Sequence, residues 1–137
     1  MRNEQQNFWE NEYAKDYIKK NESFDKEKGV EGWRKILKST SGISSVLECG
    51  SNIGRNIGFL NQVLPDAKKS IIEISPKAYE IVTNQYELEM SFNGAIMDSG
   101  FESSFFDLTF TIGVLIHIHP SDLLDNMKKM FEYSNKY

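Results

Sequence analysis

Residues 46–56 decide the fold of this chain, and they read VLECGSNIGRN. An apolar, β-prone run leads into this stretch from Ile43, and the glycines Gly50 and Gly54 stand four positions apart. A helical pattern follows at once, because apolar residues recur on one face from Ile57 onward. A strand, a glycine loop and a helix in this order open nucleotide-binding α/β domains. The glycines let the backbone approach a ligand closely, and the helix start offers free N–H groups.

The loop itself narrows the class of ligand. It has neither the Gly-x-Gly-x-x-Gly fingerprint of dinucleotide-binding domains nor the Gly-Lys-Ser/Thr ending of a P-loop. The residue directly after Gly54 is Arg55 and not the lysine of a P-loop, so a phosphate ligand is not indicated. Glu48 stands at the end of the strand, beside the loop, and a carboxylate there favours a cationic or amine-bearing small molecule.

The loop resembles motif I of the class I S-adenosylmethionine-dependent methyltransferases, which reads Asp/Glu-x-Gly-x-Gly-x-Gly. Here Glu48, Gly50 and Gly54 match the motif, and Asn52 stands at its middle glycine. From Phe8 to the chain end, the sequence resembles a narrower group, the methylases associated with pseudaminic acid biosynthesis. The resemblance implies a Rossmann-like fold and S-adenosylmethionine as the cofactor. It also implies a truncated core, in which the C-terminal strands of the family are missing.

Length and composition fit one compact domain. The chain has 137 residues, of which 39% are hydrophobic, and this is enough for a single core. Its net charge is −4 and its lysines and arginines are scattered, so nucleic acid is not an expected partner. Cys49 is the only cysteine, which rules out an intrachain disulfide and a cysteine metal cluster. No apolar run has membrane-spanning length and the start does not resemble a signal peptide, so we expect a cytoplasmic protein without membrane contact.

We expect residues 1–42 to form a helical lid or cover and residues 43–137 to form the binding core. Residues 3–20 show a polar helical pattern, and a second helical face begins at Val30 and ends in a turn cluster before Gly42. The first helix carries an aromatic stripe made of Trp9, Tyr13 and Tyr17. These aromatic faces could shield a sulfonium, but simple packing on the sheet is the better interpretation for at least two of them.

Apolar segments that alternate with helical patterns predict an α/β fold with a doubly wound parallel sheet. Strands are expected at residues 44–48, 70–74, 90–97 and 106–112, the last of them buried on both faces. Residues 113–118 are expected to be a loop or turn, and helices are expected to start at Pro76 and Pro120. Right-handed crossovers give the strand order 3-2-1-4, with the ligand crevice at the carboxyl ends of the first and fourth strands.

Three acids fall at the ends of successive strands, and a parallel sheet would bring them to one crevice. Glu73 suits hydrogen bonding to ribose hydroxyls. The resemblance implies that Asp98 accepts a hydrogen bond from the adenine amino group of the cofactor. Met97 is a candidate apolar cover for the purine ring. Each acid also has a simpler interpretation: Glu73 as a solvated strand-end acid, Asp98 as a cap of Ser99, and Glu48 as a structural acid. The full set expected to bind the cofactor is Glu48, Gly50, Ser51, Asn52, Gly54, Arg55, Asn56, Glu73, Ile74, Met97, Asp98, Ser99, Thr111 and Gly113.

The catalytic candidate is His117, which could take a proton from the methyl acceptor. His119 is the only other histidine, and it either caps the helix at Pro120 or joins His117 as a metal ligand. No third ligand is in sight, so no metal site is expected. The resemblance places the turn at Thr111 and Gly113 beside the reactive methyl.

The sequence supports a methyltransferase that acts on a small molecule, and the resemblance suggests a sugar or nucleotide-linked sugar as acceptor. One alternative is a module that binds S-adenosylmethionine without transferring its methyl group. Another is a shortened subunit that completes its site by oligomerisation. Without a fifth strand, the apolar fourth strand would be an exposed edge, and we therefore expect a homo-oligomer that covers it.

Overall fold

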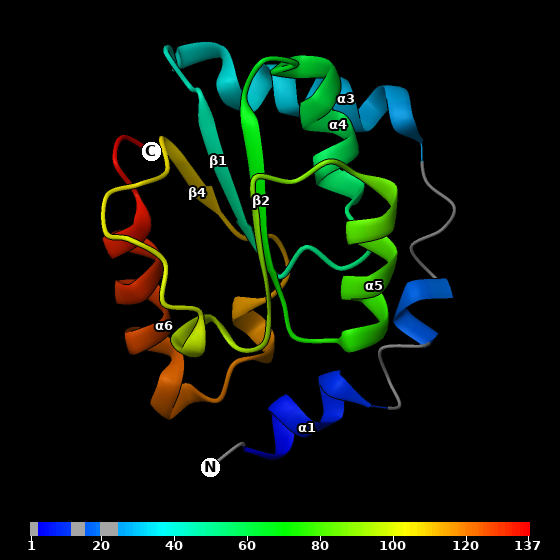
Figure 1. The fold of residues 1–137 in the computed structure, drawn as a ribbon, viewed down its shortest axis with the longest axis vertical. Helices are drawn as coiled ribbons and strands as arrows, with labels where there is room; N and C mark the ends of the chain where they lie inside the picture. Colours follow the sequence, from blue (N-terminus) through cyan, green and yellow to red (C-terminus); the bar gives the residue numbers. More distant parts are fainter. Residues whose placement is uncertain (1–2, 12–15, 20–24) are drawn as a thin grey trace.

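The sheet has four parallel strands in the order β3-β2-β1-β4 in the computed structural model, which describes residues 3–11, 16–19 and 25–137. The strands are β1 (Ser45–Cys49), β2 (Lys68–Glu73), β3 (Met90–Asn93) and β4 (Leu108–Phe110). The predicted fold class and the predicted strand order are confirmed. All four carboxyl ends point to the same edge, the lower one in Figure 1, and the order reverses between β1 and β4. In open α/β sheets this edge is where ligands bind.

Helices cover both faces of the sheet (Figure 1). The helices are α1 (Glu4–Glu10), α3 (Lys26–Ile36), α4 (Arg55–Val63), α5 (Pro76–Gln85) and α6 (Pro120–Tyr133). Short 3₁₀ turns are η1 (Leu37–Ser39), η2 (Ile96–Asp98) and η3 (Leu115–His117). Three helices, α3, α4 and α5, pack on one face, and α6 packs on the other. The short α1 belongs to neither layer and lies beyond the carboxyl ends of the strands.

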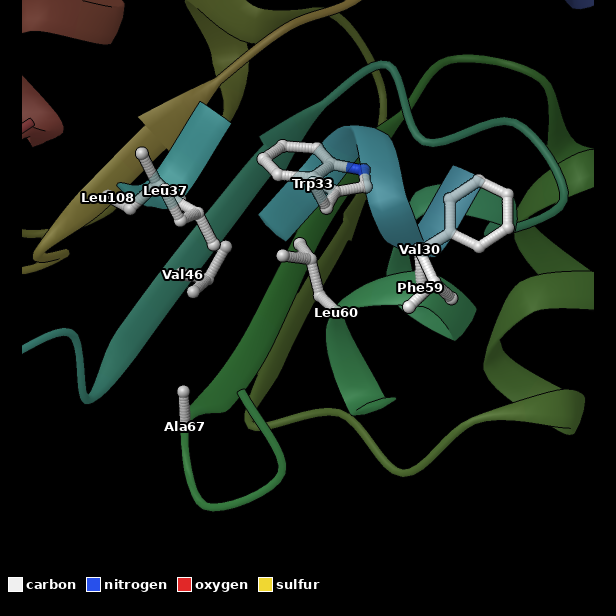
Figure 2. Close-up of a cluster of buried hydrophobic side chains, with 8 residues drawn as sticks. All are labelled: Val30, Trp33, Leu37, Val46, Phe59, Leu60, Ala67 and Leu108. Carbon is white, nitrogen blue, oxygen red and sulfur yellow. The ribbon is translucent and has the colours of Figure 1, made fainter. Parts of the chain in front are cut away.

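The main apolar cluster joins α3 and α4 to β1 and β4. Figure 2 shows its buried members, which are Val30, Trp33, Leu37, Val46, Phe59, Leu60, Ala67 and Leu108. The Trp33 ring packs edge-on against Phe110, with ring centroids 4.7 Å apart. Truncation of a buried tryptophan to alanine typically costs about 3–5 kcal/mol, so α3 is a structural layer of the core. The predicted division into a 1–42 cover and a 43–137 core stays a prediction.

The opposite face of the sheet packs against the last turn of α6. Tyr133 is fully buried there with Leu47 and Phe106. Its hydroxyl group lies 2.7 Å from Ser99 Oγ and accepts a hydrogen bond from the Phe101 N–H at 3.3 Å. A single tyrosine therefore fixes the segment that follows η2.

The segment after α6 runs along the outer edge of β4. A parallel bridge joins Ser134 to Phe106, and the Tyr137 N–H donates to the Asp107 carbonyl at 2.9 Å. The Asp107 carboxylate accepts hydrogen bonds from the Ser44 N–H and hydroxyl at 2.8 Å, and these bonds lower its pKa to about 2. The Thr109 N–H also donates to the Tyr137 carbonyl at 2.9 Å. Ser134 to Tyr137 thus pairs with the edge from Phe106 to the middle of β4, as expected for the lead-in to a fifth strand, and it shortens the exposed edge.

The strands that differ most in length from the predictions are β3 and β4. β3 ends at Asn93 because the Asn93 side chain bonds the Glu73 carbonyl at 2.7 Å and the Gly94 N–H bonds the same oxygen. The predicted continuation to Met97 is wrong, and η2 replaces it. β4 begins only at Leu108, and Leu108 is its only buried residue, so burial on both faces was predicted too broadly.

Two of the expectations concern a membrane and a metal ion. Within residues 3–11, 16–19 and 25–137, no helix is long and apolar enough to cross a membrane. The same described ranges hold no group of three or more His, Cys, Asp or Glu side chains arranged to bind a metal ion. Tyr13, a member of the predicted aromatic stripe, lies outside the described residues. The cytoplasmic location stays a prediction.

Candidate ligand-binding cavity

A cavity opens at the carboxyl edge of the sheet, and residues that follow all four strands line it. Those after β1 and β2 are Gly50, Ser51, Asn52, Ile53, Arg55, Asn56, Ile74 and Ser75, together with the strand residues Glu48, Ile72 and Glu73. Those after β3 and β4 are Gly94, Ala95, Ile96, Ile112, Gly113, Val114, His117, Ile118, His119, Asp122 and Asn126. The N-terminal segment adds Asn3, Gln5, Gln6, Trp9 and Tyr17. The cavity therefore has a sheet wall and a helical wall.

The glycine loop forms the floor of the sheet wall. Gly50, Asn52 and Gly54 all have positive φ, at 82°, 49° and 84°. Asparagine tolerates this left-handed region better than most residues, which explains how Asn52 can replace the middle glycine of the motif. A Cβ at Gly50 would overlap the Val114 side chain, so only glycine fits there. The Gly50 N–H donates to the Ile72 carbonyl at 2.7 Å, which ties the loop to β2.

Glu73 fastens the same loop from the end of β2. Its carboxylate oxygens accept hydrogen bonds from the Asn52 N–H at 2.6 Å and from the Ser75 N–H at 2.8 Å. The side chain is only 6% exposed, and burial raises the pKa of the carboxyl group against the lowering effect of these N–H donors. Glu73 thus couples the loop after β1 to the start of α5 while it lines the cavity.

Glu48 is buried at the end of β1 with one oxygen partnered and one unpartnered. Oε1 accepts a hydrogen bond from Asn56 Nδ2 at 2.7 Å, and Asn56 Oδ1 accepts one from Trp33 Nε1 at 3.2 Å. Oε2 is buried and has no hydrogen-bond partner among the described residues. Burial raises the pKa of Glu48 to about 8, and the nearby negative charge of Glu73 adds to this. A buried acceptor without a donor is costly, so the arrangement favours a ligand that supplies one.

The helical wall is made by α1, which lies beyond the carboxyl ends of the strands and lines the cavity (Figure 1). Its N-cap residue Asn3 donates from Nδ2 to Asp122 Oδ2 on α6 at 2.8 Å. The Trp9 ring lies against the His117 ring, with ring centroids 4.4 Å apart, and against Tyr17 at 5.3 Å. All residues of α1 are described, and none of them is buried. Trp9 therefore contacts the predicted catalytic residue rather than the apolar core.

Most of the residues predicted to bind the cofactor line one cavity, and the placement leaves their roles untested. Those that line it are Glu48, Gly50, Ser51, Asn52, Arg55, Asn56, Glu73, Ile74 and Gly113, together with the predicted catalytic residue His117. Gly54 lies behind the loop, where a Cβ would overlap Val82 and Tyr86. The Thr111 hydroxyl donates to the Cys49 carbonyl at 2.7 Å, so it joins β4 to β1 instead of facing the cavity.

The residues predicted to hold adenine are not in the cavity. Met97 and Asp98 are exposed, and the Ser99 hydroxyl is engaged with Tyr133 and with the Ile96 carbonyl. The reason is the early end of β3, which places the η2 turn where a longer strand was expected. Gly94, Ala95 and Ile96 line the cavity in their place, so an adenine role for Asp98 is not supported by its position.

Sequence reasoning missed three polar residues that line the cavity. Gln5, Gln6 and Asp122 belong to no motif, and only the helix-start pattern at Pro120 pointed to this region. His119 Nδ1 accepts a hydrogen bond from the Ser121 N–H at 3.3 Å, which confirms the interpretation of His119 as a helix cap.

No model of a protein family matches the sequence, and no curated protein matches it. Solved structures do match the fold. A S-adenosylmethionine-dependent methyltransferase of Leishmania major is 20% identical, with a TM-score of 0.72 over 82% of this chain and 48% of that chain. The sugar N-methyltransferase KedS8 of Streptoalloteichus is 16% identical, with a TM-score of 0.69 over 87% of this chain and 48% of that one. The plantazolicin methyltransferase BpumL, in complex with SAH, is 15% identical, with a TM-score of 0.65 over 89% and 48%.

These structural neighbours are methyltransferases, and this chain has the sheet and the flanking helices of their Rossmann-like class I fold. The predicted resemblance in fold is therefore confirmed. The chain spans about half the length of each neighbour. At these identities the likeness concerns the fold, and function has to be argued from the cavity.

Proposed function

We propose that this chain binds S-adenosylmethionine in the cavity at the carboxyl edge of its sheet and belongs to a methyltransferase for a small molecule. The observation that carries the proposal is the combination of a tight glycine loop with the buried, unpartnered Oε2 of Glu48 in one cavity. A cationic ammonium group is the donor that such an oxygen lacks. The demethylated product SAH, which has such a group, is bound by the neighbour BpumL.

The chain's own side chains have distinct tasks in this proposal. Glu48 holds the amino group of the cofactor, and Glu73 both fixes the loop and offers its oxygens to hydroxyl donors of the ligand. Gly50 keeps the floor of the cavity free of side-chain atoms. The bound cofactor supplies an electrophilic methyl group on a positively charged sulfur. Its alignment with the acceptor is the main catalytic requirement, because in-line displacement depends on position.

His117 is the proposed base of the reaction. It follows β4, lines the cavity and is held against the Trp9 ring. It takes the proton that the acceptor atom loses as its lone pair forms the new bond to carbon and the sulfur retains the electrons of the broken bond. An acceptor with a free lone pair at neutral pH would need this help less.

A sugar or nucleotide-linked sugar is the proposed acceptor class. Two observations support it: the sequence resembles methylases associated with pseudaminic acid biosynthesis, and the neighbour KedS8 is a sugar N-methyltransferase. The polar groups on this side of the cavity suit such a hydroxylated compound: they are the amides of Gln5 and Gln6, the Asp122 carboxylate and the His117 imidazole.

A second candidate function is binding of S-adenosylmethionine without methyl transfer. The specific observation in its favour is that the chain spans about half the length of the neighbours. Transfer of radiolabelled methyl to a panel of sugar nucleotides separates the two functions, because a binding module takes up the cofactor and transfers nothing.

We also propose that the chain self-associates through the outer edge of β4. Ser134 to Tyr137 pairs with this edge as far as Thr109, the middle residue of the strand, and Ile112 beyond the strand is 49% exposed. If this edge paired with the same edge of a second copy, the unpaired backbone groups of both strands would gain hydrogen-bond partners and both exposed isoleucines would be covered. Sedimentation equilibrium tests this, and a monomer at high protein concentration would contradict it.

The test of the central proposal is calorimetric titration of the protein with S-adenosylmethionine and with SAH. We expect stoichiometric binding of both. A folded protein that binds neither would overturn the proposed function.

A further inference from the structure

We propose that Gln5, on the helical wall of the cavity, is an acceptor-binding residue, and that together with Trp9 it forms a subsite for a hydroxylated or amino-bearing ring such as a hexosamine. This inference rests on the proposed function, because it assigns the acceptor to the wall opposite the glycine loop. It gives α1 a specific chemical task in addition to covering the cavity.

Gln5 has a buried carbonyl oxygen that nothing satisfies. Its Oε1 is inaccessible to solvent and has no hydrogen-bond partner among the described residues, although the residue lines the cavity. Burial of an amide oxygen without a donor costs free energy, because the oxygen has lost its water and gained no partner. A ligand O–H or N–H group that reaches Oε1 would recover this free energy.

The neighbouring amides on α1 are already engaged, which singles out Gln5. The Gln6 side chain accepts from the Asn3 N–H at 3.1 Å, and the Asn3 side chain accepts from the Gln6 N–H at 2.9 Å. This reciprocal capping box fixes the start of α1. Gln5 takes no part in it, so among the side-chain amide oxygens of Asn3, Gln5 and Gln6 it is the Gln5 oxygen that lacks a donor.

Contacts at both ends of α1 determine which part of the cavity Gln5 faces. Asn3 bonds Asp122 on the first turn of α6, and Trp9 packs on His117 after β4. Gln5 and Trp9 stand four residues apart and therefore share one face of the helix. The helical wall thus borders His117, whereas Glu48 and Glu73 belong to the sheet wall. A ligand bonded to Gln5 would lie beside the proposed base.

The chemistry of the subsite selects the acceptor class. Trp9 lines the cavity while its ring packs against His117 and Tyr17, so it adds apolar surface beside the proposed base. Gln5 Oε1 requires a hydrogen donor, and the Asp122 carboxylate adds negative charge nearby. Rings that carry several hydroxyl or amino groups suit all three features, because they have C–H groups for apolar contact and O–H or N–H donors around the rim. An amine on a purely apolar ring would interact favourably with the negative charge of Asp122 but would lack the hydroxyl donors around its rim.

The experiment compares three variants of the full chain. Gln5→Leu removes the amide and keeps the size of the side chain, and Gln5→Glu keeps two acceptor oxygens. Asn7→Leu is the matched control, since Asn7 is on the same helix, is exposed and does not line the cavity. Each protein is titrated with SAH, and then with glucosamine or cyclohexylamine by calorimetry and saturation-transfer NMR, with and without saturating SAH.

We expect the wild-type protein to bind glucosamine more tightly than cyclohexylamine. Gln5→Leu should weaken glucosamine binding by about fivefold to tenfold, the usual effect of one lost hydrogen bond, without changing SAH affinity. Gln5→Glu and Asn7→Leu should bind glucosamine at least as well as the wild type. Equal glucosamine affinities of Gln5→Leu and the wild type would overturn the subsite, and so would a wild type that binds SAH and does not bind glucosamine.

The same titrations distinguish this inference from the proposed function. Glucosamine binding that depends on Gln5 in a protein that does not bind SAH would support the subsite and overturn the methyltransferase proposal. If all variants bind SAH and glucosamine binding does not depend on Gln5, the subsite is overturned and the proposed cofactor site is supported.

Discussion

The two walls of the cavity are built in opposite ways. In the sheet wall Glu48, Ser51 and Glu73 are buried, and they are bonded to the loop backbone or to α4. In the helical wall no residue of α1, all of which are described, is buried, and the helix is held by contacts at its two ends. One wall is part of the core, and the other is attached to it.

The difference predicts how stability and binding should separate. A substitution in the sheet wall changes backbone geometry and buried hydrogen bonds, so it should affect folding and binding together. A substitution in α1 should change the ligand contacts and leave global unfolding almost unaffected, because elements with little buried surface open at low free energy. Each prediction below tests one side of this contrast.

Gly50→Ala should have the largest effect. An alanine at φ 82° is strained by roughly 1–2 kcal/mol, and its Cβ would also overlap Val114. We expect the free energy of unfolding to fall by about 2–4 kcal/mol and SAH binding to be lost, as measured by urea denaturation and calorimetry. The control is Gly32→Ala in α3, where no described atom lies within 4 Å of the added Cβ, and there we expect a gain of about 0.5–1 kcal/mol. Similar changes in unfolding free energy and SAH binding for Gly50→Ala and Gly32→Ala would contradict a special role of the glycine loop in the sheet wall.

Glu73→Ala should have the next largest effect on binding. It leaves the Asn52 and Ser75 N–H groups without their acceptor, so the loop loses its anchor as well as a ligand contact. We expect SAH affinity to fall by about 30-fold or more, against no more than about threefold for His117→Ala, which leaves the sheet wall intact. Calorimetry measures both variants. Equal losses would mean that Glu73 has no special place in the cavity.

Glu48→Gln should remove a pH dependence. The folded state raises the pKa of Glu48 from 4.5 to about 8, so its protonated form is the one that folding favours. Its contribution to stability is therefore complete below about pH 4.5 and is lost as the pH rises through 8. Glu48→Gln should then be more stable than the wild type by about 1–3 kcal/mol at pH 9 and similar to it at pH 5, as measured by urea denaturation.

The same substitution sharpens the proposed ligand contact. An ammonium ligand favours the ionised carboxylate, so wild-type affinity for SAH should rise with pH up to about 8 and be accompanied by proton release. In Glu48→Gln the affinity should be lower and flat over this range. Titrations in buffers of different ionisation enthalpy measure the released protons, and a wild type that releases none would contradict an ammonium at Glu48.

The sheet wall could be read from the sequence because its determinants are local. The spacing of Gly50, Asn52 and Gly54 requires a tight turn after a strand, and the positions of Glu48 and Glu73 follow from strand ends. The topology follows from the alternation of strands and helices. Such patterns depend on neighbours in the chain and little on distant contacts.

The remainder of the cavity depends on contacts between distant parts of the chain. The position of Asp98 was mispredicted because the side chain of Asn93 ends β3 early, through a bond to the Glu73 carbonyl across the sheet. Gln5 could not be singled out, since its place in the cavity depends on the bond from Asn3 to Asp122, residues that are far apart in the sequence. No local pattern encodes either contact.

The smallest expected effect concerns the attachment of α1, and it tests the contrast most directly. Asn3→Ser keeps an oxygen to cap the Gln6 N–H and loses the amide donor to Asp122. We expect the free energy of global unfolding to change by less than about 0.5 kcal/mol, because every residue of α1 is described and none of them is buried. Release of Trp9 from His117 should nevertheless shift the tryptophan fluorescence towards that of a solvated indole, with Trp33 as a constant buried background. A large loss of global stability in Asn3→Ser would mean that α1 belongs to the core after all, whereas fluorescence unchanged from the wild type would mean that Trp9 alone holds the helix in place.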